Sequence, residues 1–294
     1  NLWQLMQRAG AAVFQQIKEK FPDARKLIII CGKGNNGGDG YTIAALAHQA
    51  GLSVTVVVKG ARESIADNAK LALEQLDGLP IKIMFYHDVA LIQQTVKDFQ
   101  GDLLVDCLFG IGFNGYLSAP YVELITEINN TLCPRVSVDV PSGLNADLGT
   151  ISTVAVKATL TVTLIAYKQG LLSGQAANFV GNLQLETLAA NHALAQLTKA
   201  LCFVQNKQNL PVISPRLPCS HKGHIGLLLA VGGHHAYTGA ICLAAEAALR
   251  SGASLVSVCC HEMSRTPLLT RRPEVMIAAN SLQTLSSSPV LDKA

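Results

Sequence analysis

The chain has 294 residues, of which 49% are hydrophobic and 15% are charged, so it is too apolar for a disordered chain and long enough for two domains. Its 23 basic and 20 acidic residues leave a formal charge of +3 without any basic run, which argues against nucleic acid as a partner. No apolar run reaches the roughly 18–20 residues that a membrane span needs, so we expect no membrane partner.

Alternating apolar and helical segments run from residue 25 to about residue 165, at the spacing of βαβ units. The expected strands are Leu27–Cys31, Val54–Val58, Ile81–Phe85, Leu103–Asp106, Val136–Val140 and Leu160–Ile165. The expected helices are Leu2–Lys20, Tyr41–Ala50, Ile65–Leu76, Asp88–Phe99 and Tyr121–Asn129. The pattern predicts an α/β fold with a Rossmann-like, doubly wound and mostly parallel sheet.

The pattern weakens after about residue 188, and we place the domain boundary near Leu210, giving domains 1–209 and 210–294. The second domain is expected to begin with a strand at Ile225–Val231, a glycine turn, a helix at Gly239–Ser251 and a strand at Leu255–Cys259. Its roughly 85 residues are few for an α/β domain, so we expect it to be cut off before its sheet is complete.

The cysteines indicate the compartment. Four of the eight, Cys31, Cys107, Cys242 and Cys259, lie inside apolar runs, and the chain has no C-x-x-C pair that would indicate zinc or redox chemistry. We interpret them as reduced, buried thiols and expect a cytoplasmic protein.

The first strand is followed by a glycine-rich loop, Gly32–Gly40, which satisfies G-x-G-x-x-G and would let a phosphate approach the backbone. Lys59, however, stands at the end of the second strand, where an ordinary NAD fold has an acidic residue. Asn35 and Asn36 add amides that could orient a polar ring or bind a cation through oxygen. The loop therefore differs from the usual dinucleotide fingerprint.

Two further strand ends carry acidic residues. Asp106 closes the fourth expected strand and is a candidate acid/base or metal ligand, or else a cap for nearby amides. Asp139 lies near the end of the fifth expected strand and Ser142 follows it, and we expect both to face the same crevice as Asn36 and Asp106. Without a positioned His or a Cys–His pair, this set favours acid/base chemistry assisted by a hard cation over a hydrolase.

Three runs resemble the signature segments of NAD(P)H-hydrate epimerases over roughly residues 1–190: CGKGNNGGDGY at Cys31–Tyr41, VDCLFGIGFNG at Val105–Gly115 and VDVPSG at Val138–Gly143. Beyond the boundary, SHKG, GG and YTGA, the last ending at Ala240, resemble the opening of the ADP-dependent NAD(P)H-hydrate dehydratases, which have a ribokinase-like fold. His224 departs from that pattern, since the family usually has Asp there.

The resemblance implies an enzyme that repairs hydrated nicotinamide cofactors. Its isomerase domain would interconvert the R and S forms of NADHX and NADPHX at the hydroxyl-bearing carbon 6, and its lyase domain would dehydrate the S form at the expense of ADP, at a site mostly outside this chain. The implied substrate-binding residues are Asn35, Asn36, Gly37, Gly38, Asp39, Gly110, Ile111, Gly112, Phe113, Asn114, Gly115, Tyr116, Asp139 and Ala240.

The resemblance also implies a potassium ion at Asn36, Asp106 and Ser142, and Asp106 is our first choice for the proton carrier. The two roles conflict, because a carboxylate held against a cation is a poor acid. We further expect a homo-oligomer, because the chain begins with the apolar residues Leu2, Trp3, Leu5 and Met6.

Three alternatives remain open. The glycine fingerprints also occur in NAD(P)-dependent oxidoreductases, which Lys59 and the missing Tyr-x-x-x-Lys relay disfavour. A non-catalytic nucleotide-binding module is disfavoured by Asp106. For the second domain, a small-molecule kinase of the ribokinase type shares the expected fold.

Overall fold

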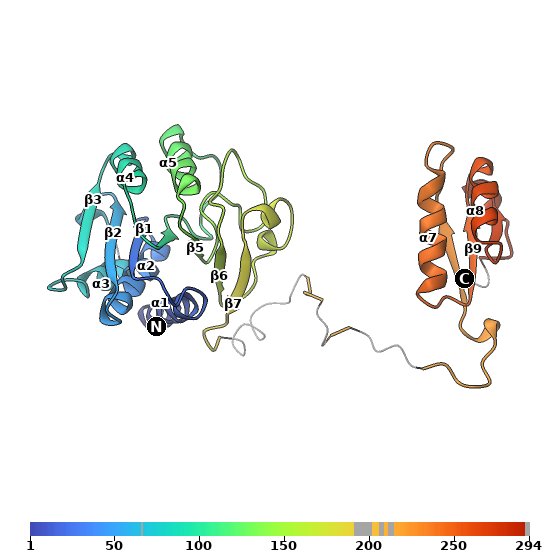
Figure 1. The fold of residues 1–294 in the computed structure, drawn as a ribbon, viewed down its shortest axis with the longest axis horizontal. Coiled ribbons are helices and arrows are strands. Elements are labelled where there is room, and N and C mark those ends of the chain that lie inside the picture. Colours follow the sequence, from blue (N-terminus) through green and yellow to red (C-terminus); the bar gives the residue numbers. More distant parts are fainter. Residues whose placement is uncertain (66, 191–201, 206–208, 211–214, 292–294) are drawn as a thin grey trace. The chain divides into compact units, whose positions relative to one another are not determined.

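The structure is a computed structural model that describes residues 1–65, 67–190, 202–205, 209–210 and 215–291. The chain divides into two compact units, Asn1–Val204 and Gln205–Ala294 (Figure 1). The domain boundary expected between residues 209 and 210 stays a prediction.

The first unit is built on a seven-stranded sheet in the order β3-β2-β1-β4-β5-β6-β7, and every neighbouring pair is parallel. Its strands are β1 (Lys26–Cys31), β2 (Ser53–Lys59), β3 (Lys82–Tyr86), β4 (Leu103–Cys107), β5 (Arg135–Val138), β6 (Leu160–Leu164) and β7 (Asn182–Glu186). The strand order reverses between β1 and β4, which is the point where open parallel sheets bind ligands.

Among the described residues, the helices that cover the two faces of this sheet are α1 (Leu2–Lys20), α2 (Asn35–Gln49), α3 (Asp67–Glu74), α4 (Val89–Lys97) and α5 (Ala119–Asn130). Figure 1 shows α4 and α5 on one face and α1, α2 and α3 on the other. Successive residues of β1 point to opposite faces: Leu27 and Ile29 pack with α1 and α2, whereas Ile28 and Ile30 pack with α4 and α5. The predicted doubly wound α/β fold is confirmed.

Two boundaries near the site and one strand differ from the sequence prediction. The expected loop Gly32–Gly40 is short, because α2 already begins at Asn35. Strand β5 ends at Val138, and the next residue, Asp139, has a φ of 68° that no strand accommodates. Strand β7 was not expected, and its side chains are only half-buried or exposed at the edge of the sheet.

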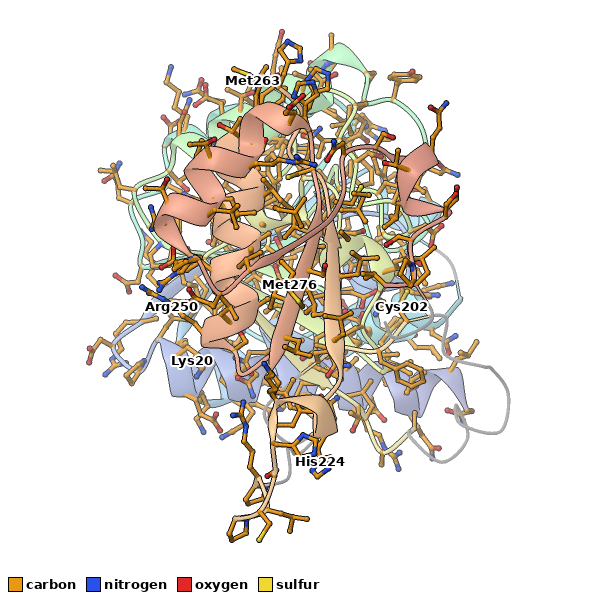
Figure 2. The ribbon with its side chains drawn as sticks, turned by 90° about the vertical axis from the view of Figure 1, so that its right-hand side faces the viewer. Lys20, Cys202, His224, Arg250, Met263 and Met276 are labelled. Atoms are coloured by element: carbon orange, nitrogen blue, oxygen red, sulfur yellow. The ribbon has the colours of Figure 1, made fainter. Side chains whose placement is uncertain are left out.

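The second unit contains a three-stranded parallel sheet in the order β10-β9-β8. Its strands are β8 (Leu227–Val231), β9 (Leu255–Cys259) and β10 (Met276–Ala279), and its helices are α7 (Thr238–Arg250), α8 (Arg265–Arg271) and α9 (Leu282–Leu285). In Figure 2, the labelled Arg250 ends α7 and Met276 begins β10. The expected strand, turn, helix and strand are confirmed.

In the described part of the chain, no helix combines the length and hydropathy needed to cross a membrane.

Candidate functional site

A cavity of about 1050 Å³ lies at the carboxyl ends of the strands of the first unit. Its walls come from the segments that follow β1, β4, β5 and β6, and from Lys59 at the end of β2. Leu2, Leu5, Met6 and Ala9 of α1 line it as well. The three segments that resemble the epimerase signatures, Cys31–Tyr41, Val105–Gly115 and Val138–Gly143, thus each contribute residues to one cavity at the switch point of the sheet.

The first segment enters the cavity as the opening turn of a helix. Gly34 caps α2, so the free backbone N–H groups of its first turn begin at Asn35, beside the cavity. Close packing holds this turn in place: a Cβ on Gly32 would lie 2.1 Å from the carbonyl oxygen of Leu108, and one on Gly37 would lie 2.1 Å from that of Gly32. The glycines therefore bring the helix end against the segment after β4.

A chain of hydrogen bonds joins the three expected cation ligands. The Nδ2 group of Asn36 donates to the carbonyl oxygen of Phe109 at 2.8 Å, and the backbone N–H of Phe109 donates to Oγ of Ser142 at 2.9 Å. Ser142 Oγ donates to Oδ1 of Asp106 at 2.6 Å. Oδ1 of Asn36 is buried without a partner among the described residues. A buried amide oxygen without a donor is the kind of atom that a cation satisfies.

Asp106 is fully buried and does not line the cavity. Its Oδ1 accepts from Ser142 Oγ and from the backbone N–H of Leu108, and its Oδ2 accepts from Ser137 Oγ and from the backbone N–H of Ser142. Burial raises the pKa of Asp106, although these hydrogen bonds oppose the shift. The position suits a fixed ligand better than a group that exchanges protons with a molecule in the cavity.

Asp139 does line the cavity, and it forms an ion pair with Lys168. All of its hydrogen bonds with described residues reach Oδ1: from the Lys168 ammonium, from the backbone N–H of Leu164 at 3.0 Å and from Thr163 Oγ1 at 3.4 Å. Its φ of 68° is uncommon outside glycine, although Asp tolerates it better than most residues. Oδ2 remains open to a ligand.

Asp39 is the second carboxyl group on the cavity wall, and only 8% of the residue is exposed. Burial raises the pKa of Asp39 well above its usual range, and the charge of Asp139 raises it further. The two carboxyls therefore act on each other across the cavity wall.

The rest of the wall combines aromatic rings with basic groups. The ring centroids of Phe109 and Phe113 lie 5.1 Å apart, and so do those of Phe109 and Tyr121. Lys33 and Lys59 also line the cavity and bring positive charge near the start of α2. Flat apolar rings beside lysines and free backbone amides suit a ligand with a planar group and phosphates.

The other expected residues divide by position. Asn35, Gly110, Ile111, Gly112 and Asn114 line the cavity. Gly37 and Gly38 are buried in the first turns of α2, and Gly115 and Tyr116 lie outside the lining, with Tyr116 89% exposed. Ala240 lies in the second unit, where it is exposed in the first turn of α7.

Lys168 was missed in the sequence. It belongs to no glycine motif, but it follows a buried strand, β6, by four residues, and the strand-end rule that selected Asp106 and Asp139 applies there too. The helix residues Leu2, Leu5 and Met6 were also missed as part of the cavity, because their spacing indicates only a face packed on the sheet.

Two family models match the chain. Residues 3–170 match the family described as YjeF-related protein N-terminus, and residues 228–293 match the family described as NAD(P)H-hydrate dehydratase.

The chain is also similar to curated proteins. It is 38% identical over 289 residues to the bifunctional NAD(P)H-hydrate repair enzyme Nnr of Escherichia coli (strain K12), which covers 98% of this chain and 55% of that protein. It is 39% identical over 277 residues to the enzyme of the same name from Vibrio cholerae, covering 94% and 55%. The chain thus spans about half the length of the curated relatives it matches.

Among solved structures, the crystal structure of the yeast protein ynu0 is similar to 58% of this chain and 73% of the yeast chain, with a TM-score of 0.52 and 28% sequence identity.

Proposed function

Because the chain belongs to the YjeF-related N-terminal family, we propose that its first unit interconverts the R and S forms of hydrated NADH and NADPH. One observation carries the proposal: residues from all three segments line the same cavity, namely Asn35, Asn36, Asp39, Gly110–Asn114 and Asp139. Two relatives, 38% and 39% identical over 289 and 277 residues, are named as bifunctional NAD(P)H-hydrate repair enzymes.

The cavity has the size and chemistry that such a substrate needs. Its volume of about 1050 Å³ is at the upper end of the range for small-molecule sites, as a dinucleotide requires. Lys33, Lys59 and the start of α2 would receive phosphates, and the rings of Phe109 and Phe113 would contact a nicotinamide-derived ring. The carboxyls of Asp39 and Asp139 would supply the acid/base groups that inversion of a hydroxyl-bearing carbon requires.

We assign potassium to Asn36, Asp106 and Ser142. The unpartnered Oδ1 of Asn36, the hydroxyl of Ser142 and the buried charge of Asp106 form an oxygen-rich set that fits a weakly held hard cation. A bound cation would fix the segment after β4 against α2, because Asn36 and Ser142 both hold the Phe109 peptide. In this proposal Asp106 is a cation ligand, and the proton role expected for it passes to the cavity wall.

The second unit belongs to the other half of the repair reaction in this proposal. Residues 228–293 match the NAD(P)H-hydrate dehydratase family, so we assign ADP-dependent dehydration of the S form to the intact domain to which this unit belongs, with Ala240 as a substrate contact.

The homo-oligomer stays a proposal with reduced support. Of the four apolar residues that motivated it, Met6 is buried, Trp3 and Leu5 are half-buried and only Leu2 is strongly exposed. Light scattering at micromolar concentration tests it, and a monomer would contradict it. All eight cysteines are free, and the cytoplasmic location stays a prediction.

The activity is tested with purified R-form hydrated NADH, incubated with the chain in potassium buffer and sampled by chromatography. We expect the S form to appear much faster than in buffer alone. A rate equal to the spontaneous one would contradict the proposal. If the nicotinamide absorbance changed only when a hydride acceptor was added, the oxidoreductase alternative would be favoured instead.

A further inference from the structure

The carboxyl group of Asp39 is buried without the contacts that normally hold a buried carboxylate. It accepts no hydrogen bond from any residue that the structure describes, and no described cation pairs with it. Asp106, in the same unit, accepts four hydrogen bonds. An uncompensated buried carboxylate is costly, so the neutral acid is the form that this position stabilises. A neutral carboxyl can donate a proton to a bound molecule.

Asp139 has the opposite environment on the same cavity wall. The Lys168 ammonium compensates its charge, and the backbone N–H of Leu164 adds a second donor to the same oxygen, Oδ1. Lys168 is fully engaged, because it also donates to Thr163 Oγ1 at 3.1 Å and to the carbonyl oxygen of Leu164 at 2.6 Å. Oδ2 of Asp139 is thus left as an acceptor facing the cavity.

We propose that Asp39 and Asp139 are a catalytic pair in which Asp39 donates the proton and Asp139 accepts one, an inference that rests on the function proposed above. Asp39 is buried without a partner among the described residues, whereas Asp139 is paired with an ammonium group, and two carboxyls in such contrasting surroundings can supply one site with both an acid and a base. Asp39 therefore takes a chemical role in addition to the substrate contact expected from the sequence.

The step balances without any co-reactant. The neutral Asp39 carboxyl protonates the hydroxyl oxygen on carbon 6, the carbon–oxygen bond breaks with its electron pair leaving in water, and the lone pair of the ring nitrogen forms a double bond to that carbon. Water then adds to the opposite face, the π pair returns to nitrogen, and Asp139 takes the proton that the water loses. A proton passing from Asp139 back to Asp39 restores the starting state.

The test compares Asp39→Asn and Asp39→Ala with the matched control Asp23→Asn, at an exposed aspartate that does not line the cavity. Each variant is made in the full chain, and conversion of R-form to S-form hydrated NADH is measured with the spontaneous rate subtracted. We expect kcat to fall by about 10²–10⁴-fold in both Asp39 variants, with KM changed by less than about threefold, because an acid is lost while the cavity remains. Asp23→Asn should keep the wild-type rate.

The activity of the wild-type chain distinguishes a failure of the proposed function from a failure of the proposed catalytic pair. If the wild type is no faster than buffer, the proposed function fails. If the wild type is active and either Asp39 variant retains more than about a tenth of its kcat, or loses activity only through KM, Asp39 is not the acid and the pair is wrong. Two variants are used because Ala favours the helix at this position even if Asn disturbs its packing.

Discussion

At the scale of single residues, the buried carboxyl of Asp39 affects stability as well as chemistry. Its folded-state pKa lies well above the ordinary value of 3.8, so the folded state binds this proton more tightly than the unfolded state does. The resulting stabilisation is fully present below about pH 4 and is lost as the pH rises through the folded-state pKa. The side chain introduced by Asp39→Asn cannot ionise, so this variant does not lose stability in that way as the pH rises.

Asp39→Asn should therefore be at least as stable as the wild type near pH 7, and the difference in its favour should grow between about pH 5 and pH 8. Urea unfolding followed by the fluorescence of Trp3 measures this, because Trp3 is the only tryptophan and packs against the core of the first unit. If the free energy of unfolding of Asp39→Asn fell further below that of the wild type as the pH rose, the proposed neutral carboxyl at position 39 would be contradicted.

Asn36 gives a second residue-scale prediction, for potassium. Replacing sodium by potassium at equal ionic strength should raise the Tm of the first unit, since a ligand that binds only the folded state stabilises it, by about 2.7 kcal/mol at 100 times Kd. Asn36→Ala removes the unpartnered oxygen and should abolish the potassium-dependent part of the Tm. Asn68→Ala, at another asparagine of the cavity wall, should keep it. If potassium raised the Tm of Asn36→Ala as much as that of the wild type, the proposed potassium site would be contradicted.

The sequence located the site better than it assigned roles within it. Asp106 and Asp139 were found because both lie at the ends of buried strands. Their positions look alike in the sequence, and only the folded chain separates them: Asp106 turns inward to Ser137 and Ser142, and Asp139 faces the cavity with Lys168. Lys168 was missed because it belongs to no motif and lies 29 residues from Asp139, so its place after β6 was the one signal for it.

At the scale of elements, the start of α2 was misplaced for a physical reason. Glycine lowers helix propensity, so four glycines between residues 34 and 40 predict a loop. Here the glycines let α2 pack closely against its neighbours. A Cβ on Gly38 would lie 2.6 Å from Met6 of α1, and one on Gly40 would lie 2.7 Å from Cys31 of β1. Tertiary contacts override the local preference, and the helix begins at Asn35.

The edge strand β7 and the later elements α8 and β10 escaped prediction because their sequences carry weak periodicity. The side chains of β7 are half-buried or exposed, so it lacks the apolar run that identifies the central strands β1 and β4.

A cluster of ion pairs in the second unit connects helices α7 and α8. Glu246 of α7 pairs with Arg250 at 2.8 Å, and with Arg271 at 2.6 Å and Arg272 beside α8. Hydrogen bonds from Arg271 and Arg272 lower the pKa of Glu246 from 4.5 to about 2. This stabilisation is present above about pH 4.5 and is lost as the pH falls toward 2.

Glu246→Gln should therefore speed amide hydrogen exchange in α7 and α8 at neutral pH, and the gap to the wild type should close as the pH falls toward about 2. The matched control is Glu262→Gln, an exposed glutamate of the same unit, which should leave the exchange unchanged. Equal protection of wild type and Glu246→Gln at neutral pH would show that the cluster does not tie the two helices together.

At the scale of the whole molecule, the two units carry separate halves of one proposed repair reaction. The cavity to which we assign the epimerase activity is lined by residues of the first unit. A defect at Asp39 should therefore leave the folding of the second unit and its hydrogen-exchange protection as in the wild type.

The most direct measurement is a crystal structure of the full chain carrying Asp39→Asn, with hydrated NADH bound, since this variant should hold the substrate without converting it. We expect the hydroxyl-bearing carbon 6 to lie in the cavity of the first unit, with its hydroxyl within about 2.6–3.2 Å of residue 39 or of Asp139 Oδ2. This expectation includes phosphates beside Lys33 and the start of α2. A dinucleotide bound elsewhere, or with its hydroxyl out of reach of both side chains, would contradict it.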